Sequence, residues 1–345
     1  MSSIHTYISD TLQISLPSIE NTIKLLDGGA TIPFISRYRK EATGGLNEVQ
    51  IAQISEMYDK MIELEKRKSF ILKSIDEQGK LTDELKRKID DCMEAVELED
   101  IYLPYKPKRQ TRAEIARKKG LEGLAKWLMS QPPVAVEQKA ADFVGKEVAD
   151  ADEALKGACD IIAEWVNEDE KARQTVRNIF AREAVITSKV VKGKETEGEK
   201  YSDYFAFSAI LSRCPSHRLL AIRRGEAEGF LRVSISPDDD KCIEKLLFRY
   251  VRNHSEAADY VKKAVIDGYK RLLKPSIETE FANLAKEKAD DEAISVFADN
   301  LRQLLLAAPL GQKRILAIDP GYRTGCKVVC LGEQGDLLHN ETIYP

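Results

Sequence analysis

The sequence of 345 residues lacks the patterns that build most metal and cofactor sites. Its six cysteines never form a C-x-x-C pair, and its four histidines never form H-E-x-x-H, which argues against a zinc site. Neither G-x-x-x-x-G-K-S/T nor G-x-G-x-x-G occurs, so the common phosphate-binding loops are absent. We therefore predict no metal, no cofactor and no small-molecule substrate.

Long apolar stretches are missing as well. No run approaches the roughly eighteen apolar residues of a membrane-spanning helix. The N-terminus, MSSIHTYISD, has neither the basic start nor the apolar core of a signal peptide. The net charge of −4 argues against a uniformly basic surface, but it is compatible with local basic patches. These features predict a cytoplasmic protein without a membrane partner.

Helical patterns dominate the first 310 residues. Residues 18–27 have apolar side chains at helical spacing, and the glycines at 28–29 supply a stop. A short helix is expected from Pro33, and Asn47 is expected to cap a longer one. Two short helices, a tight turn and a longer helix are typical of a helix-turn-helix-like unit, which we predict for residues 1–75.

The region 76–310 is predicted to be a helical central region. We expect one helix over 81–100 that ends with acidic residues, followed by an extended connection enforced by the prolines of 104–107. The next helix is expected to begin at Thr111, with the T-x-x-E spacing of a capping box, and to end at Gly120.

We expect one β-strand in the second half of this region. Helices are expected over 151–184, and the polar stretch 190–205 is expected to be a loop. Residues 230–236 alternate apolar and polar side chains, which predicts a strand. Helices are expected again over 238–252 and 255–306.

After residue 310 the pattern changes to three strands, and the first of them ends at Asp319. A carboxylate on the first of three consecutive strands is typical of the opening of an RNase H-like α/β domain, here incomplete over 311–345. Such sites use three or four carboxylates from separate elements to hold one or two Mg²⁺ ions. The remaining ligands would come from elements further along the chain. The acidic residues that are present lie in the next turn and the third strand and cannot take their place; they are Glu333, Asp336 and Glu341. Asp319 is therefore a vestigial or incomplete catalytic candidate.

Two other interpretations of this stretch stay open. The phosphate-binding hairpin of sugar kinases and actin-like ATPases matches only at Asp319 and Gly321, and it needs two large lobes that the sequence does not show. Alternatively, Pro320 and Gly321 form a simple turn that Asp319 caps.

Basic residues gather in three segments that would suit phosphate binding. Between Pro104 and Gly120 the sequence has seven basic residues and one acidic residue. Tyr102 and Tyr105 are nearby, and their rings would offer planes on which bases stack. An equally open interpretation is that this segment pairs internally with the acidic stretch 90–100. The candidate nucleic-acid-binding residues are Arg37, Arg39, Lys40, Lys106, Lys108, Arg109, Arg112, Arg117, Lys118, Lys119, Arg218, Arg223 and Arg224.

Several blocks of the chain resemble, in order, the signature blocks of the bacterial Tex family of transcription accessory proteins. They include IPFISRYRKEATGGL, PSHRLLAIRRGEAEGFL and ILAIDPGYRTGCKV. The resemblance implies a helical N-terminal region, a resolvase-related RNase H-like domain, helix-hairpin-helix modules and a C-terminal S1 domain that binds RNA. Because the sequence stops near the third strand of the RNase H-like domain, we expect an N-terminal fragment in which the helix-hairpin-helix and S1 domains are absent.

The sequence therefore predicts a mainly α protein followed by the first three strands of an α/β domain. The predicted function is a non-catalytic scaffold in transcription that binds RNA, DNA or both, with proteins of the transcription machinery as further partners. One alternative is a metal-dependent RNase H-like nuclease when full length. The other is a protein-docking platform, suggested by the acidic residues of 90–100.

Overall fold

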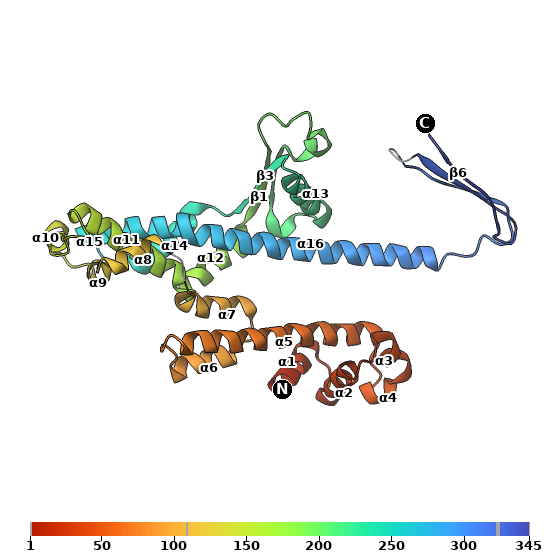
Figure 1. The fold of residues 1–345 in the computed structure, drawn as a ribbon, viewed down its shortest axis with the longest axis horizontal. Coiled ribbons are helices and arrows are strands. Elements are labelled where there is room, and N and C mark those ends of the chain that lie inside the picture. The colour runs from red at the N-terminus through yellow and green to blue at the C-terminus, as the bar shows by residue number, and fades with distance from the viewer. Residues whose placement is uncertain (1, 108–109, 322–324, 345) are drawn as a thin grey trace.

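The computed structural model describes residues 2–107, 110–321 and 325–344. It is mainly helical, as predicted, and it contains two separate three-stranded sheets (Figure 1). The helices of the first part are α1 (Ser2–Leu12), α2 (Leu16–Asp27), α3 (Ile32–Tyr38), α4 (Lys40–Thr43), α5 (Glu48–Asp76), α6 (Asp83–Asp91) and α7 (Ala95–Tyr102). The later helices are α8 (Arg112–Lys118), α9 (Glu122–Ser130), α10 (Val136–Ala141), α11 (Ala151–Glu168), α12 (Glu170–Glu183), α13 (Ser216–Ala227), α14 (Asp239–Tyr250), α15 (Glu256–Gly268) and α16 (Lys274–Leu305).

The long helix α5 connects two apolar cores. Its N-terminus is fixed by a capping box, in which the Asn47 side chain accepts from the Gln50 amide at 2.9 Å and the Gln50 side chain accepts from the Asn47 amide at 3.0 Å. The first half of α5 buries Ile54 among α1–α3, and the second half buries Ile71 against α6 and α7. The predicted cap at Asn47 is confirmed, whereas the helix-turn-helix interpretation of 1–75 stays a prediction.

The single helix predicted over 81–100 is wrong, because the chain breaks it into α6 and α7. Cys92 adopts an extended backbone, with φ −71° and ψ 124°, and its thiol donates to the carbonyl of Glu94. The predicted extended connection at 104–107 is only partly correct, since Leu103–Tyr105 forms a 3₁₀ turn before the backbone extends at Lys106. The predicted end of the next helix is confirmed by Gly120, whose φ of +78° suits glycine.

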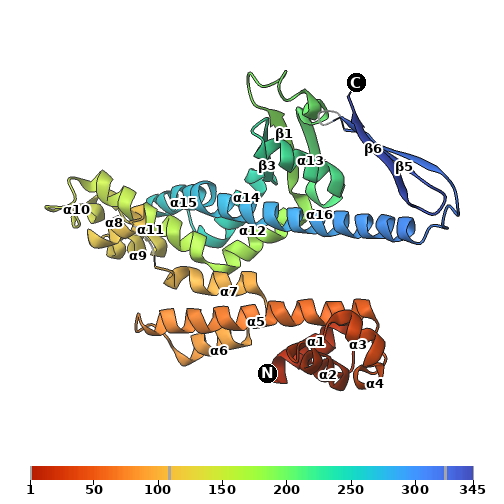
Figure 2. The same cartoon turned by 45° about the vertical axis from the view of Figure 1, so that its right-hand side comes forward.

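The largest core lies among α8–α16. The helices α11 and α15 pack closely, and Gly268 at the end of α15 lies directly against the backbone of α11. A π-helical turn, Tyr269–Leu273, joins α15 to α16, and the Tyr269 side chain is fully buried there. Helix α16 then runs along the molecule past α12 and α13 (Figures 1 and 2). The domain boundaries at 75 and 310 stay predictions.

The first sheet has the antiparallel order β2-β1-β3. Strand β3 (Leu231–Ser236) confirms the strand predicted at 230–236. The other two strands of this sheet, β1 (Val185–Val190) and β2 (Ala206–Ile210), were not predicted. The stretch between them is a loop that contains a 3₁₀ segment.

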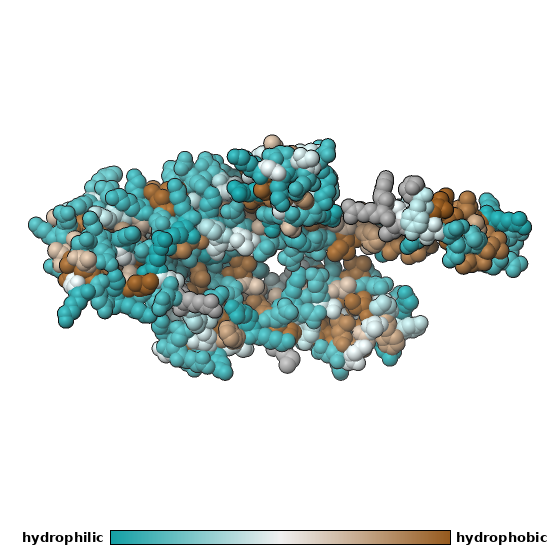
Figure 3. Space-filling view, turned by 45° about the horizontal axis from the view of Figure 1, so that its top comes forward, coloured by the Kyte–Doolittle hydropathy of each residue, from teal (hydrophilic) through white to brown (hydrophobic). Residues whose placement is uncertain are grey.

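The second sheet is an antiparallel meander of order β4-β5-β6. Its strands β4 (Ile315–Asp319), β5 (Cys326–Leu331) and β6 (Leu337–Ile343) confirm the three predicted strands. The sheet stands apart from the helical body in Figure 1, and hydrophobic side chains show on it in Figure 3. Among the described helices, none is long and apolar enough to cross a membrane.

Candidate nucleic-acid interface

The short helices α3 and α4 present an exposed surface of aromatic and basic side chains. Thr31 begins α3 by accepting from the Phe34 amide, and Pro33 occupies its first turn. Ile35 is fully buried and anchors the helix to the first core. The rings of Phe34 and Tyr38 lie on the outer side of the helix, since Phe34 is 41% exposed and Tyr38 is 67% exposed.

The two rings and the neighbouring cations form one cluster. The ring centroids of Phe34 and Tyr38 lie 5.4 Å apart, and the Arg39 guanidinium lies 5.3 Å from the centroid of Phe34. Arg37 and Lys40, which are near these residues in sequence, are exposed as well. In the part of the chain that the structure describes, these three cations make no ion pair. We call the five residues the α3–α4 surface.

Helix α4 is held in place by its neighbours in α2. The side-chain amide of Asn21 donates to the carbonyl of Ala42 at 2.8 Å. Gly44 ends α4 with φ +70° and lies so close to Ser18 that a β-carbon would be only 2.7 Å from the serine hydroxyl oxygen. These contacts fix the position of Lys40 relative to α3.

The basic segment after Pro104 is partly engaged in internal ion pairs. Arg117 pairs with Glu164 of α11 and Lys119 pairs with Glu153 at 2.6 Å, and the hydrogen bond from Lys119 is the main cause that lowers the pKa of Glu153. The interpretation that this segment pairs with the stretch 90–100 is therefore wrong for these two residues, whose partners are acids of α11. Lys106, Arg112 and Lys118 are exposed, whereas Lys108 and Arg109 lie outside the described residues.

One of the two tyrosines expected to stack on bases is not available. Tyr102 is only 2% exposed, and its hydroxyl lies 2.9 Å from the hydroxyl of Ser74. Tyr105 is half-buried. The aromatic contribution predicted for this segment is therefore reduced to one partly accessible ring.

The third basic segment lies on α13. Arg218 and Arg224 are exposed, whereas Arg223 is half-buried and pairs with Glu226. The structure does not bring the three segments together, since α3–α4, α8 and α13 lie on different parts of the molecule in both ribbon views (Figures 1 and 2). Among the described residues of the three segments, only the α3–α4 surface combines cations that make no ion pair with two exposed rings.

Sequence reasoning found the cations of this surface but missed Phe34 and Tyr38. The available signal was their spacing, because residues four apart lie on the same face of a helix. This spacing places the two rings on one face of the helix, next to three cations. It predicts that the rings are exposed only when the buried face of the helix is known. Here Ile35 and Ser36 define that face.

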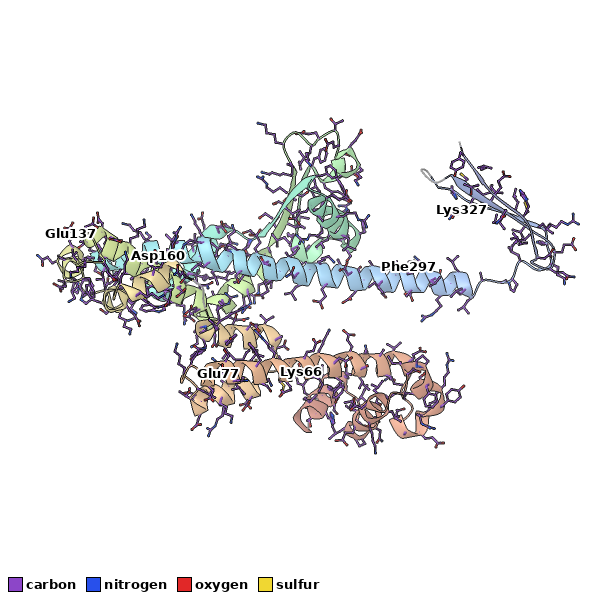
Figure 4. All side chains as sticks on the ribbon, viewed as in Figure 1. Lys66, Glu77, Glu137, Asp160, Phe297 and Lys327 are labelled. Atoms are coloured by element: carbon purple, nitrogen blue, oxygen red, sulfur yellow. The ribbon has the colours of Figure 1, made fainter. Side chains whose placement is uncertain are left out.

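The carboxylate of Asp319 is at the end of β4, opposite Lys327 of β5 in the strand register (Lys327 is labelled in Figure 4). Over residues 2–107, 110–321 and 325–344, no three His, Cys, Asp or Glu residues are grouped so that they could hold a metal ion. Asp319 therefore belongs to no such group among the described residues.

Comparison with known families identifies the chain. Residues 2–76 match the Tex-like protein N-terminal domain, residues 131–297 match the Tex central region, and residues 313–345 match the YqgF-like domain of Tex proteins. The chain belongs to the Tex family.

Curated relatives extend over nearly the whole chain. The "Transcriptional accessory protein Tex" of Neisseria gonorrhoeae is 42% identical over 348 residues, covering 99% of this chain and 46% of that protein. "Protein YhgF" of Escherichia coli is 43% identical, covering 98% of this chain and 45% of that protein. The human "S1 RNA-binding domain-containing protein 1" is 28% identical, covering 94% of this chain and 34% of that protein. The chain thus spans less than half the length of these relatives.

Proposed function

We propose that this chain serves as a non-catalytic nucleic-acid-binding scaffold of a transcription accessory protein, and that the α3–α4 surface contacts the nucleic acid. The observation that carries the proposal is the α3–α4 surface, where two exposed rings lie with three cations that make no ion pair with another described residue. Cations without internal partners can neutralise phosphates and release counterions. Exposed rings offer planes on which bases stack, at about 1–3 kcal/mol per base.

The comparisons support the transcription part of this proposal. A relative is named as a transcriptional accessory protein and another as an S1 RNA-binding domain protein. The helix-turn-helix and RNase H-like assignments, the cytoplasmic location and further partners in the transcription machinery are parts of the same proposal. The surface on α3–α4 adds a contact that the S1 module of such relatives would not supply.

Charge reversal on the α3–α4 surface is expected to weaken nucleic-acid binding at least about tenfold at 0.1 M salt, because three phosphate contacts are lost. The variant carries Arg37→Glu, Arg39→Glu and Lys40→Glu, and fluorescence anisotropy with labelled RNA and DNA measures its affinity. The matched control, Lys66→Glu, Lys80→Glu and Lys86→Glu, changes the same charge on exposed residues of α5 and α6 and their connection, and should retain most of the binding. Lys66 is labelled in Figure 4.

A second variant compares the α3–α4 surface with the basic segment around α8. Lys106→Glu, Arg112→Glu and Lys118→Glu together reverse the exposed cations around α8. We expect this variant to lose less affinity than the α3–α4 variant. A greater loss would move the interface to α8, and equal losses in all three variants would mean that only net charge matters.

The chain is expected to show no Mg²⁺-dependent cleavage of RNA or DNA, because Asp319 belongs to no group of three possible metal ligands among the described residues. Incubation of labelled substrates with Mg²⁺ or Mn²⁺, followed by gel analysis, measures this. Asp319→Asn should be indistinguishable from the parent. Cleavage that Asp319→Asn abolishes would support the nuclease alternative.

A further inference from the structure

A groove lined by methionines lies between α1, the middle of α5 and the start of α7. Its volume is about 580 Å³, and its apolar lining includes Tyr7, Met57, Met61, Leu64 and Met93. Three of the five methionines of the chain therefore line one groove. All three are half-buried, so part of each side chain is accessible. We call this feature the Met groove.

The groove follows from the way α5 connects two cores. Met57, Met61 and Leu64 are spaced so that they lie on one face of α5. Met61 contacts both the core of α1–α5 and the core of α5–α7. The face between the two cores is therefore apolar but incompletely covered. Methionine side chains are flexible and polarizable, which lets such a surface adapt to the shape of an apolar partner.

The rim of the groove carries an excess of negative charge. Its two basic residues are already paired, Lys60 with a neighbouring glutamate at 2.8 Å and Arg67 with Glu99 at 2.6 Å. Glu63 and Glu94 also line the groove, and neither makes an ion pair with another described residue. Two carboxylates are thus left to attract positive charge from outside.

Helix α16 adds to this negative field. The pKa of Lys60 is raised first by its hydrogen bond to Glu56, and the carboxylates of Glu287 and Asp291 on α16 contribute further. Both α16 residues are exposed. Acidic side chains of α5, α7 and α16 therefore act on the same part of the molecule.

We propose that the Met groove binds an amphipathic helix of a partner protein, with apolar anchors spaced i, i+4 and i+7 and with lysine or arginine beside them. A helix that lays its apolar face into a groove is a common recognition mode, and methionines suit it. The acidic rim selects a basic helix, because unlike charges speed encounter and like charges disfavour binding. The site is separate from the α3–α4 surface and goes beyond nucleic-acid binding.

The test uses methionine methyl groups as reporters. The full chain is labelled with ¹³C in its methionine methyls and titrated with a designed leucine–lysine amphipathic helix of about five turns. We expect saturable shifts of the Met57, Met61 and Met93 signals. Met129 on α9 lies outside the groove and should not move. Equal shifts at Met129, or none at the groove methionines, would overturn the proposal.

Paired variants then separate shape from charge. Met57→Gln with Met93→Gln keeps the side-chain length but removes apolar contact, and Glu63→Lys with Glu94→Lys reverses the rim. Each pair of substitutions is expected to weaken the affinity for the peptide at least about tenfold at 0.1 M salt. The control pair, Glu77→Lys with Glu137→Lys, makes the same charge change at the end of α5 and on α10 (Figure 4). It should lower the affinity for the peptide less than about twofold.

Three results would overturn the assignment. The first is an equal loss in the rim pair and the control pair, which would mean attraction by net charge alone. The second is equal binding of a peptide with glutamate in place of lysine. The third is self-association that shifts the groove methionines without peptide, which would make a second copy the occupant. The Arg37, Arg39 and Lys40 variant should retain peptide binding.

Discussion

Replacing Asp100 with alanine is expected to lower the free energy of unfolding by about 3–5 kcal/mol, because it leaves two buried arginines without their carboxylate. Asp100 of α7 accepts from Arg173 at 2.6 Å and from Arg177 at 2.9 Å, and all three side chains are buried. Arg177 also donates to Glu280 of α16 at 2.7 Å. One aspartate therefore ties α7 to α12, and through Arg177 to α16.

The electrostatics of Arg177 show why this network depends on all its members. Burial alone would lower the pKa of Arg177, but its hydrogen bonds to Asp100 and Glu280 raise that pKa above its usual value. Removing Asp100 leaves the burial cost without its main compensation. Because Arg177 stays charged, the loss of Asp100 lowers the free energy of unfolding.

Urea unfolding followed by circular dichroism measures this effect. The matched control is Glu56→Ala, which breaks the exposed ion pair with Lys60 and should cost less than about 1 kcal/mol. Asp100→Asn keeps an acceptor and should fall between the parent and Asp100→Ala. A loss for Asp100→Ala as small as that of Glu56→Ala would show that the network does not hold α7 to α12.

Gly268→Ala is expected to cost about 2–3 kcal/mol, although alanine favours helix over glycine by about 1 kcal/mol. A β-carbon at residue 268 would lie 2.8 Å from the carbonyl oxygen and 3.1 Å from the α-carbon of Ala163. These are backbone atoms of α11, which cannot rotate away as a flexible side chain would. The helices α11 and α15 would have to separate, and the core between them would lose close packing.

Thermal unfolding compares this variant with a second helical glycine. In Gly123→Ala on α9, the nearest atoms are ring carbons of Phe143 at 3.4 Å and 3.5 Å, and no backbone atom interferes. The control should be neutral or slightly stabilising, by up to about 1 kcal/mol. A stabilised Gly268→Ala protein would contradict the close approach of α11 and α15.

Local signals in the sequence predicted local structure well. The cap at Asn47 and the stop at Gly120 depend on a few neighbouring residues, and both are present in the fold. The break near Cys92 was missed because no proline or glycine marks it, and the helical pattern continues across it. Strand β3 was found by its alternation of apolar and polar residues. Strands β1 and β2 lack so clear a pattern, and they are defined by the pairing of β1 with both β2 and β3.

Long-range contacts set the limit of the sequence-based prediction. The acidic stretch 90–100 looked like a partner for the basic segment after it, but Asp100 pairs with arginines of α12 that lie 73 and 77 residues away. The basic segment instead uses acids of α11. Charge pattern alone cannot choose between partners of the same sign. The exposed rings of the α3–α4 surface were missed because exposure depends on how α3 packs.

The salt dependence of nucleic-acid binding tests the proposed function most directly. Anisotropy titrations of the parent chain with single-stranded RNA, across a salt series, give the slope of log affinity against log salt. We expect the Arg37, Arg39 and Lys40 variant to reduce the magnitude of that slope by about two, since each lost phosphate contact contributes about 0.7. The control at Lys66, Lys80 and Lys86 should leave the slope unchanged. An unchanged slope in the α3–α4 variant, or no salt-dependent binding by the parent chain, would contradict the proposed interface.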